Sequence, residues 1–363
     1  MPKRTPLYGE HLSLGAKMVE FGGWEMPVSY SGIIEEHLAV RNAAGLFDIG
    51  HMGVVEISGK DSLPFIQKLA TNDASRLSDY HSQYSILLNQ NGGVIDDILV
   101  YRLPEGFTFI LNASNTEKDL AWFKKNLSGA VKIEHRTDVC MLSLQGPKSE
   151  LILSSFCDIN LSPLKRNGCA LGLVFGKKCL VSRTGYTGED GFELFLSAGD
   201  VKAAWNGILK EGRPSGLIPC GLGARDSLRI EAALPLYGHE YTEEITPLEA
   251  GYGWAVKFDK DSFIGKAALI ELKAKGLKRK LCGVVLEGRS IPRHGMAAFA
   301  DKELSLSAGE ITSGTFSPVL SRSIGLLYAS TDLAGLGGPL FIDIRGRASA
   351  GNVVGLPFYK RAN

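Results

Sequence analysis

An α+β fold with a C-terminal β-barrel is the fold class that the sequence predicts. Before residue 273 the expected helices and strands follow one another without the regular alternation of a doubly wound parallel sheet. After that point come short apolar runs separated by Gly, Pro and Ser, which are typical of a small barrel or sandwich. The length of 363 residues allows two or three domains, each with its own core.

The individual elements follow from hydrophobic periodicity. Segments with an apolar face at helical spacing predict helices over residues 32–44, 62–70, 115–127, 200–211 and 222–233. Runs rich in β-branched and aromatic residues predict strands over 52–58, 84–90, 93–101, 107–113, 179–184 and 192–196. The basic run 273–280 is typical of a solvated helix end or linker. Short barrel strands are expected between residues 282 and 359.

Charge and composition exclude several classes of protein. The 40 basic and 39 acidic residues leave a net charge of +1, so no basic footprint for nucleic acid is present. No segment approaches the roughly 18 apolar residues of a membrane span, and the N-terminus lacks the apolar core of a signal peptide. A cytoplasmic protein with reduced cysteines is therefore expected. The seven histidines lack H-x-x-x-H or H-E-x-x-H spacing, so no metal site is expected.

Two adjacent aspartates, Asp96 and Asp97, lie in the most informative segment, residues 84–114. The dipeptide Asn91-Gly92 predicts a two-residue hairpin loop, which would place Tyr84 and Asp97 on one sheet face as diagonal neighbours. A second loop, of residues 104–105 or 103–106, would place Asn112 directly across from Asp97. A three-residue loop with a bulge would shift this second register by one residue.

The strand that carries these aspartates has apolar residues on both faces, which predicts that both faces are covered. At least one carboxylate then points into the interior or a cavity, where it must be paired, hydrogen-bonded or neutralised. It could cap a nearby backbone turn, or it could serve function. The functional hypothesis favours Asp97, because Tyr84 and Asn112 would share its face.

Two further polar positions stand out. Glu193 lies in the predicted strand 192–196, on the face opposite Phe192 and Leu194. A solvent-exposed carboxylate is the commoner case for such a residue, and a partly buried acceptor for ligand N–H groups is the sharper hypothesis. Arg225 lies near the start of the predicted helix 222–233, where the helix dipole gives no reason for a cation. It could simply pair with an acidic residue elsewhere. A dinucleotide-binding loop is excluded here, because the G-x-G-x-x-G pattern fails at Asp226.

Ten segments in order together resemble the glycine cleavage T-proteins over essentially the whole chain. They are Thr5–Tyr8, Gly15–Tyr30, Glu36–Arg41, Leu46–Gly53, Tyr84–Tyr101, Ser182–Glu193, Gly221–Gly238, Leu248–Trp254, Ile311–Pro318 and Pro357–Lys360. The Lys-Gly-Cys-Tyr-x-Gly-Gln-Glu signature of related iron–sulfur maintenance proteins is absent, as is the flavin domain of related oxidising enzymes.

The resemblance implies a three-domain cloverleaf around a central folate cavity. The implied domains are 1–50 plus 139–225, 51–138 plus 226–275, and the barrel 280–363. The implied activity is transfer of the methylene of an aminomethyl group from the dihydrolipoyl arm of H-protein to tetrahydrofolate, with release of ammonia. A monomer that meets H-protein transiently is expected. The alternatives are a folate-dependent demethylase and a non-enzymatic folate-binding module of the same superfamily.

The resemblance also assigns site residues. Asp97 falls at the position of the essential aspartate. Glu193 falls where a carboxylate accepts the two parallel N–H donors of the pterin edge. The remaining positions expected around the folate are Met52, Tyr84, Leu99, Tyr101, Asn112, Tyr186, Arg225 and Trp254.

Overall fold

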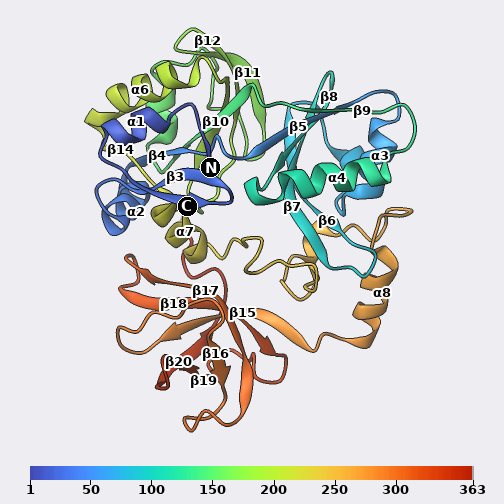
Figure 1. The fold of residues 1–363 in the computed structure, drawn as a ribbon, viewed down its shortest axis with the longest axis vertical. Coiled ribbons are helices and arrows are strands. Elements are labelled where there is room, and N and C mark those ends of the chain that lie inside the picture. Colours follow the sequence, from blue (N-terminus) through green and yellow to red (C-terminus); the bar gives the residue numbers. More distant parts are fainter. Residues whose placement is uncertain (362–363) are drawn as a thin grey trace. The chain divides into compact units, whose positions relative to one another are not determined.

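A computed structural model describes residues 1–361 (Figure 1). The chain forms two compact units. The first unit contains residues 1–67, 73–85 and 98–226, and the second contains residues 68–72 and 86–97 and the chain from Ser227 on. Helices and strands mix throughout, which confirms the α+β prediction. The α-helices are α1 (Tyr8–Ser13), α2 (Ile33–Asn42), α3 (Ser62–Leu69), α4 (Thr116–Asn126), α5 (Ser149–Ser154), α6 (Val201–Gly212), α7 (Leu222–Glu231) and α8 (Lys266–Lys275).

A six-stranded sheet forms the main core of the first unit. Its strands, in spatial order, are β11 (Cys169–Val174), β12 (Lys177–Ser182), β13 (Gly191–Ser197), β10 (Val139–Gln145), β4 (Ala44–Asp48) and β14 (Leu217–Pro219). The alternating apolar residues of β13 enter the core together with the apolar face of α6, as the period-two pattern predicts. Strands β4 and β10 were not among the predicted elements. A separate three-stranded sheet near the N-terminus has the order β1 (Lys3–Arg4), β3 (Trp24–Ser29) and β2 (Lys17–Phe21).

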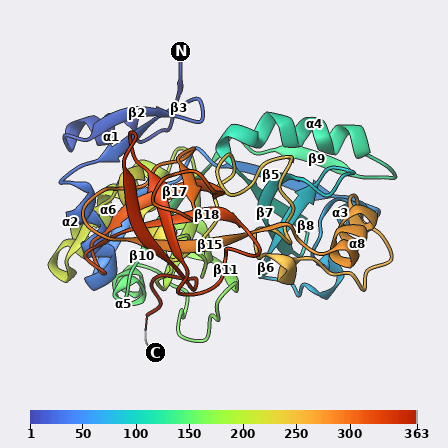
Figure 2. The ribbon, with the colours of Figure 1, turned by 90° about the horizontal axis from the view of Figure 1, so that it is seen from below.

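A five-stranded sheet contains the paired aspartates. Its order is β6 (His81–Leu88), β7 (Val94–Leu103), β8 (Gly106–Leu111), β5 (Gly53–Ser58) and β9 (Lys132–His135). Helix α4 covers part of this sheet (Figure 2), with Phe123 edge-on against Phe109 at 5.7 Å between ring centroids. Every residue of β7 is buried or half-buried, which agrees with the expected cover on both faces.

The two hairpin predictions have different outcomes. Strands β7 and β8 close with the pair Leu103 and Gly106, so the two-residue loop is confirmed, and its register continues to Leu99 opposite Ile110. The Asn91-Gly92 loop prediction is wrong. The N–H of Asn89 donates to the carbonyl of Gly93, and the N–H of Gly92 donates to the carbonyl of Asn89, so the loop has three residues and Gly92 takes φ +84°.

This correction changes the argument about faces. A three-residue loop at the turn moves the expected partner of every β7 residue by one position, and a one-residue slip exchanges the two faces of a strand. The turn therefore no longer supports a shared face for Tyr84 and Asp97. That placement now depends on the family resemblance alone. The pairing of Asp97 with Asn112 lies beyond the observed ladder and stays a prediction.

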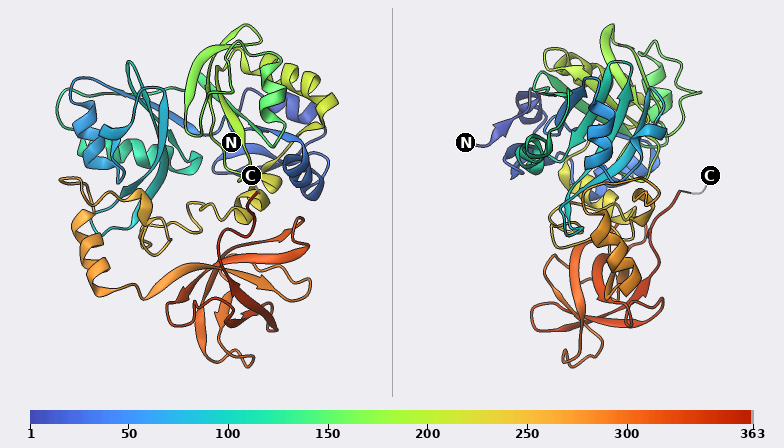
Figure 3. Two further views of the ribbon diagram at one scale, coloured as in Figure 1. Left: turned by 180° about the vertical axis from the view of Figure 1, so that it is seen from behind. Right: turned by 90° about the vertical axis from the view of Figure 1, so that its right-hand side faces the viewer.

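A closed barrel of six strands lies in the second unit, as predicted (Figure 3). The strands are β15 (Arg279–Leu286), β16 (Ala297–Phe299), β17 (Ser307–Ser317), β18 (Arg322–Ser330), β19 (Pro339–Asp343) and β20 (Ala348–Val354). Each contains one of the short apolar runs read from the sequence. The basic run before the barrel comprises the last turn of α8 and its link to β15, in agreement with the prediction.

A buried ion pair connects α7 to the barrel inside the second unit. The Arg229 guanidinium lies 2.7 Å from an Oε2 atom of Glu240, and both side chains are almost completely buried. Arg229 also donates to the Ser313 hydroxyl at 2.7 Å, and the Thr312 hydroxyl donates to Glu240 at 2.5 Å. Ser313 and Thr312 belong to β17, so the pair holds the helix and the barrel in one packed arrangement.

The chain forms the two compact units described above, and the three-domain division stays a prediction. Within residues 1–361, no helix is long and apolar enough to cross a membrane. Over the same residues, no group of three or more His, Cys, Asp or Glu side chains is arranged to hold a metal ion, and the metal-free site also stays a prediction.

Candidate functional site

Glu193 lies in the middle of the six-stranded sheet. On β13 it stands opposite Ser143 of β10 on one side and Ser182 of β12 on the other. Only 6% of its surface is exposed. The commoner expectation of a solvent-exposed carboxylate is therefore wrong for this residue. A carboxylate in such a position must be hydrogen-bonded or hold a ligand.

A chain of hydroxyl groups reaches one oxygen of this carboxylate. The Thr184 hydroxyl donates to Oε2 of Glu193 at 2.6 Å, and the Tyr101 hydroxyl lies 3.2 Å from Thr184 Oγ1. A threonine has a single hydroxyl proton, and Thr184 uses it in the hydrogen bond to Glu193. In the contact with Tyr101 the tyrosine hydroxyl is therefore the donor and Thr184 Oγ1 the acceptor. Ser182 lies 3.1 Å from the same Thr184 oxygen. One carboxylate oxygen is thereby fixed, and a carboxylate has further acceptor capacity for a ligand.

The electrostatics of the cluster follow from its burial. Burial raises the pKa of Glu193 above its usual range, while the Thr184 hydrogen bond and the positive charge of Arg225 partly oppose the rise. Burial, with the neighbouring Glu193 charge, raises the pKa of Tyr101 as well, so that Tyr101 stays a neutral donor. A carboxylate that is destabilised in this way gains from a ligand that offers it N–H donors.

Arg225 and Tyr186 meet in the same unit. The Arg225 guanidinium lies over the Tyr186 ring, 4.6 Å from its centroid. Gln145 fixes the loop that carries Tyr186 by two hydrogen bonds. Its side-chain amide donates to the Thr184 carbonyl at 3.1 Å and accepts from the Thr187 hydroxyl at 3.0 Å. A Cβ atom at Gly185 would approach Gln145 Oε1 to 2.0 Å, so a larger residue at that position would displace the Gln145 amide from these two hydrogen bonds.

The other predicted folate residues of the first unit lie in four separate parts of the chain. Tyr84 and Leu99 are half-buried on β6 and β7. Asn112 is half-buried and directly follows β8, with its carbonyl accepting from the N–H of Asn115 at 2.9 Å. Met52 is half-buried in the turn between β4 and β5. Their arrangement around a common ligand stays a prediction.

The two aspartates differ in burial. Asp96 is fully buried and Asp97 is half-buried, so Asp97 is the one of the two that keeps accessible surface. Asp97 belongs to the second unit, as does Trp254. Trp254 has 57% of its surface exposed and lies 5.9 Å, centroid to centroid, from Tyr252. Their roles at the folate stay predictions.

Sequence reasoning missed Thr184 and Ser182. Thr184 and Ser182 are two residues apart at the end of a strand, which places them on one face. If the pairing of β12 with β13 had been known, that spacing could have indicated a row of hydroxyl groups leading to Glu193.

The comparisons with known proteins identify the family of the whole chain. The model of the GCVT N-terminal domain matches residues 7–260, and that of the glycine cleavage T-protein C-terminal barrel domain matches residues 279–360. An aminomethyltransferase of Geobacillus kaustophilus is 48% identical over 366 residues, covering 100% of both chains. One from Bacillus subtilis is 47% identical over 365 residues, covering 99% of this chain and 100% of its own.

The chain belongs to the glycine cleavage T-protein family. Its fold agrees, because the crystal structure of the glycine cleavage system aminomethyltransferase T from Bartonella henselae superposes with a TM-score of 0.93 at 34% identity, covering 99% of each chain. The predicted resemblance is confirmed. The chain is an enzyme, an aminomethyltransferase of the glycine cleavage system, and the relatives support this activity over the demethylase and the non-enzymatic module.

Proposed function

We propose that the enzyme binds tetrahydrofolate with the pterin edge on Glu193 and transfers to it the methylene carried by lipoylated H-protein. The observation that carries the proposal is the buried Glu193 carboxylate, whose Oε2 atom is fixed by Thr184. The pterin N3–H and 2-amino group are parallel donors that match a carboxylate in geometry and charge. Tyr101, behind Thr184, keeps that carboxylate in one orientation.

The reaction balances without a metal or an oxidant. The aminomethyl carbon loses its bonds to the lipoyl sulfur and to the amine nitrogen, and it gains bonds to N5 and N10 of the folate. The two folate N–H protons leave with ammonia and the thiol. We assign to Asp97 the task of positioning and charge stabilisation on the N5 and N10 side, because positioned electrostatics supply most of the catalysis in such transfers. A cytoplasmic monomer that meets H-protein transiently completes the proposal.

The overall test is formation of 5,10-methylenetetrahydrofolate from loaded H-protein and tetrahydrofolate by the purified enzyme. Product should appear together with ammonia in equal amounts. Ammonia without methylenetetrahydrofolate would contradict folate as the acceptor. Folate binding without either product would support the non-enzymatic module instead.

Replacement of Glu193 by Ala should weaken tetrahydrofolate binding by about 1.5–3 kcal/mol, the scale of hydrogen bonds to a charged group. Calorimetric titration measures the change. Since the ligand binds the ionised carboxylate, wild-type affinity should also fall as the pH drops through the raised pKa of free Glu193, earlier than for an ordinary glutamate. Affinity within error of wild type in Glu193→Ala would remove the pterin assignment.

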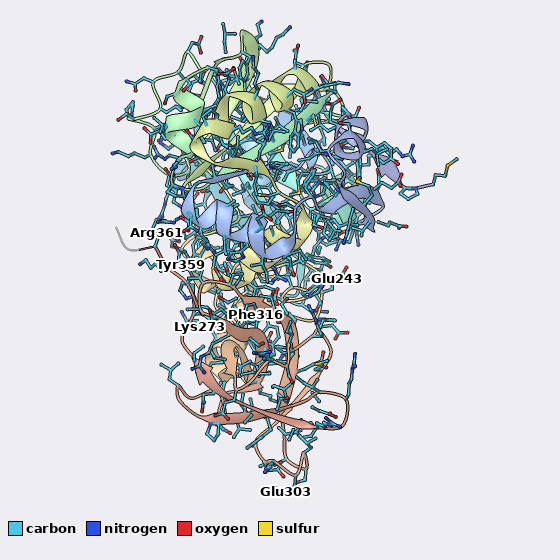
Figure 4. All side chains as sticks on the ribbon, turned by 90° about the vertical axis from the view of Figure 1, so that its left-hand side faces the viewer. Glu243, Lys273, Glu303, Phe316, Tyr359 and Arg361 are labelled. Atoms are coloured by element: carbon cyan, nitrogen blue, oxygen red, sulfur yellow. The ribbon has the colours of Figure 1, made fainter. Side chains whose placement is uncertain are left out.

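The exposed lysines around the end of α8 are our candidates for H-protein docking, together with Lys360 and Arg361. Figure 4 labels Lys273 and Arg361, both exposed. Arg279, which belongs to the same basic run 273–280, is half-buried and forms an ion pair with Glu249 at 2.8 Å. We therefore assign Arg279 a structural role and not a role in docking, and it is left unchanged in the test.

Replacing Lys273, Lys275 and Lys278 with Gln should slow the reaction with H-protein, most of all at low salt, because exposed charges raise encounter rates. The rate with free aminomethyl-dihydrolipoate should not change. A matched variant with exposed Lys165, Lys178 and Lys302 replaced by Gln carries the same net charge and should behave as wild type. Equal slowing in both triple variants would show that only net charge matters, and no slowing in either would place docking elsewhere.

A further inference from the structure

A buried ion pair between Arg41 and Glu189 is not used by the proposed chemistry. Arg41 lies in the last turn of α2, and Glu189 lies in the loop between β12 and β13. The Nη1 atom of Arg41 donates to Oε1 of Glu189 at 2.9 Å, and the two side chains are 3% and 0% exposed. Because two charges lose their hydration when they are buried, such a pair adds little net stability. The pair is better explained by what it orients.

The loop that Arg41 reaches contains the sequence Gly185-Tyr186-Thr187-Gly188. Both glycines are exposed, and Gly188 takes φ +80°. Glycine has more backbone conformations than any other residue, so local preference does not hold this stretch in one shape. The orientation of Tyr186 therefore depends on contacts that fix the chain on either side of it.

Two side chains from elsewhere in the first unit supply such contacts. Before Tyr186, the Gln145 amide donates to the Thr184 carbonyl at 3.1 Å. After it, the same Nη1 atom of Arg41 donates to the Thr187 carbonyl at 2.8 Å. Gln145 also accepts from the Thr187 hydroxyl, which belongs to a rotatable side chain. The bond from Arg41 instead fixes a carbonyl, and with it a whole planar peptide group.

We propose that Arg41 is a positioning residue that holds Tyr186 in the orientation that places its ring under the Arg225 guanidinium. The inference rests on the tetrahydrofolate site proposed above, in which Tyr186 and Arg225 bind the ligand. The Cζ atom of Arg225 lies 4.6 Å from the centroid of that ring. A ring that is already oriented loses less entropy when a ligand binds against it, so Arg41 strengthens binding through Tyr186. Glu189 keeps the Arg41 side chain directed at the loop.

The double variant Arg41→Met with Glu189→Met tests the proposal, because it removes both buried charges and leaves neither one unpaired. Its thermal unfolding midpoint should stay close to that of wild type. The dissociation constant for tetrahydrofolate, measured by calorimetry, should nevertheless rise about tenfold. The steady-state KM for tetrahydrofolate should rise with kcat unchanged, since only binding is affected. Wild-type affinity in this folded variant would overturn the proposal.

A double-mutant cycle with Tyr186→Leu shows whether the ion pair acts through Tyr186. Tyr186→Leu alone should weaken tetrahydrofolate binding, and adding the two methionine substitutions to it should cause no further loss. A further tenfold loss in the combined variant would mean that the pair acts by another route, or only on the fold, and the positioning role would be wrong. Unchanged binding in Tyr186→Leu would remove that role as well.

Asp190→Asn is the matched control on the same loop. Asp190 accepts from Nε of Arg183 at 2.9 Å, and 45% of its side chain is exposed. This variant should bind tetrahydrofolate as wild type does, because it leaves the carbonyls on either side of Tyr186 held in place. A loss equal to that of the double variant would show that any loosening of the loop lowers affinity, which contradicts a specific role for Arg41.

Comparison with Glu193→Ala separates this inference from the proposed function. If Glu193→Ala weakens tetrahydrofolate binding and the Arg41 double variant does not, the positioning role is wrong and the folate site stands. If neither variant weakens binding, the folate site itself is wrong.

Discussion

Turnover of the Asp97→Asn variant should fall by at least ~10²-fold, with the fold and folate binding preserved. The physical reason is that the N5 amine must stay unprotonated and close to the methylene carbon while ammonia leaves. A carboxylate fixed beside that carbon stabilises the positive charge that develops there, and an amide of the same size cannot. The loss should appear in kcat, since the proposed pterin anchor, Glu193, is unchanged in this variant. Steady-state rates with loaded H-protein measure it.

The adjacent Asp96 provides a matched control. It is fully buried, whereas Asp97 is half-buried on the same strand. Asp96→Asn should therefore change the stability of the protein more than its turnover, because a buried polar group acts on its packed surroundings. Equal activity in Asp97→Asn and wild type would remove Asp97 as the catalytic carboxylate. A large loss confined to Asp96→Asn would exchange the two roles.

The barrel and the second hairpin could be predicted because their signals are local. Short apolar runs between Gly, Pro and Ser specify strands and turns within a few residues, and each run became a barrel strand. Pro104-Glu105 allowed a two-residue loop, and the strands closed on it. Such features need no knowledge of distant parts of the chain.

The prediction of the first hairpin loop was wrong because hydrogen bonds to a side chain stabilise a longer loop. Asn89 Oδ1 accepts from the backbone N–H of Asn91 at 2.9 Å and from that of Gly93 at 3.0 Å. These bonds favour the longer loop, with Gly92 at the left-handed position. Gly93 is also pressed against the chain, since a Cβ there would approach the Glu243 carbonyl to 1.8 Å. The pattern Asn-Gly-Gly fits two loop lengths, and only these contacts distinguish them.

The environment of Glu193 could not be read from the sequence for a different reason. Its burial depends on the two strands beside it, β10 and β12. Strand β10 begins more than fifty residues earlier in the chain and was not predicted. Tertiary pairing of this kind decides whether a mid-strand carboxylate meets water or a closed polar cluster. The family resemblance supplied the position, and the structure supplied its burial and its bond to Thr184.

The Glu240→Ala variant should lose about 3–5 kcal/mol of stability, the cost of leaving the buried Arg229 without its partner. Urea unfolding followed by circular dichroism measures the change. The exposed pair of Lys275 and Glu271 on α8 is the control, and Glu271→Ala should leave the stability almost unchanged, because solvent screens an exposed ion pair. The double variant Arg229→Met with Glu240→Leu should recover most of the loss, because it removes both buried charges. A loss in Glu240→Ala no larger than in Glu271→Ala would contradict the role of the pair.

The pH dependence of this stability has a fixed sign. Burial alone would raise the pKa of Glu240, but Arg229 and the hydrogen bonds from Thr312, Ser313 and Leu236 outweigh it, so the pKa is lowered from 4.5. A carboxyl group whose pKa is lower in the folded state stabilises fully above its unfolded pKa and loses that contribution as the pH falls through the folded value. Wild-type stability should therefore drop below about pH 4.5 more steeply than that of the double variant, which lacks the titrating group. Parallel pH profiles for the two proteins would mean that Glu240 is not held as a charged carboxylate.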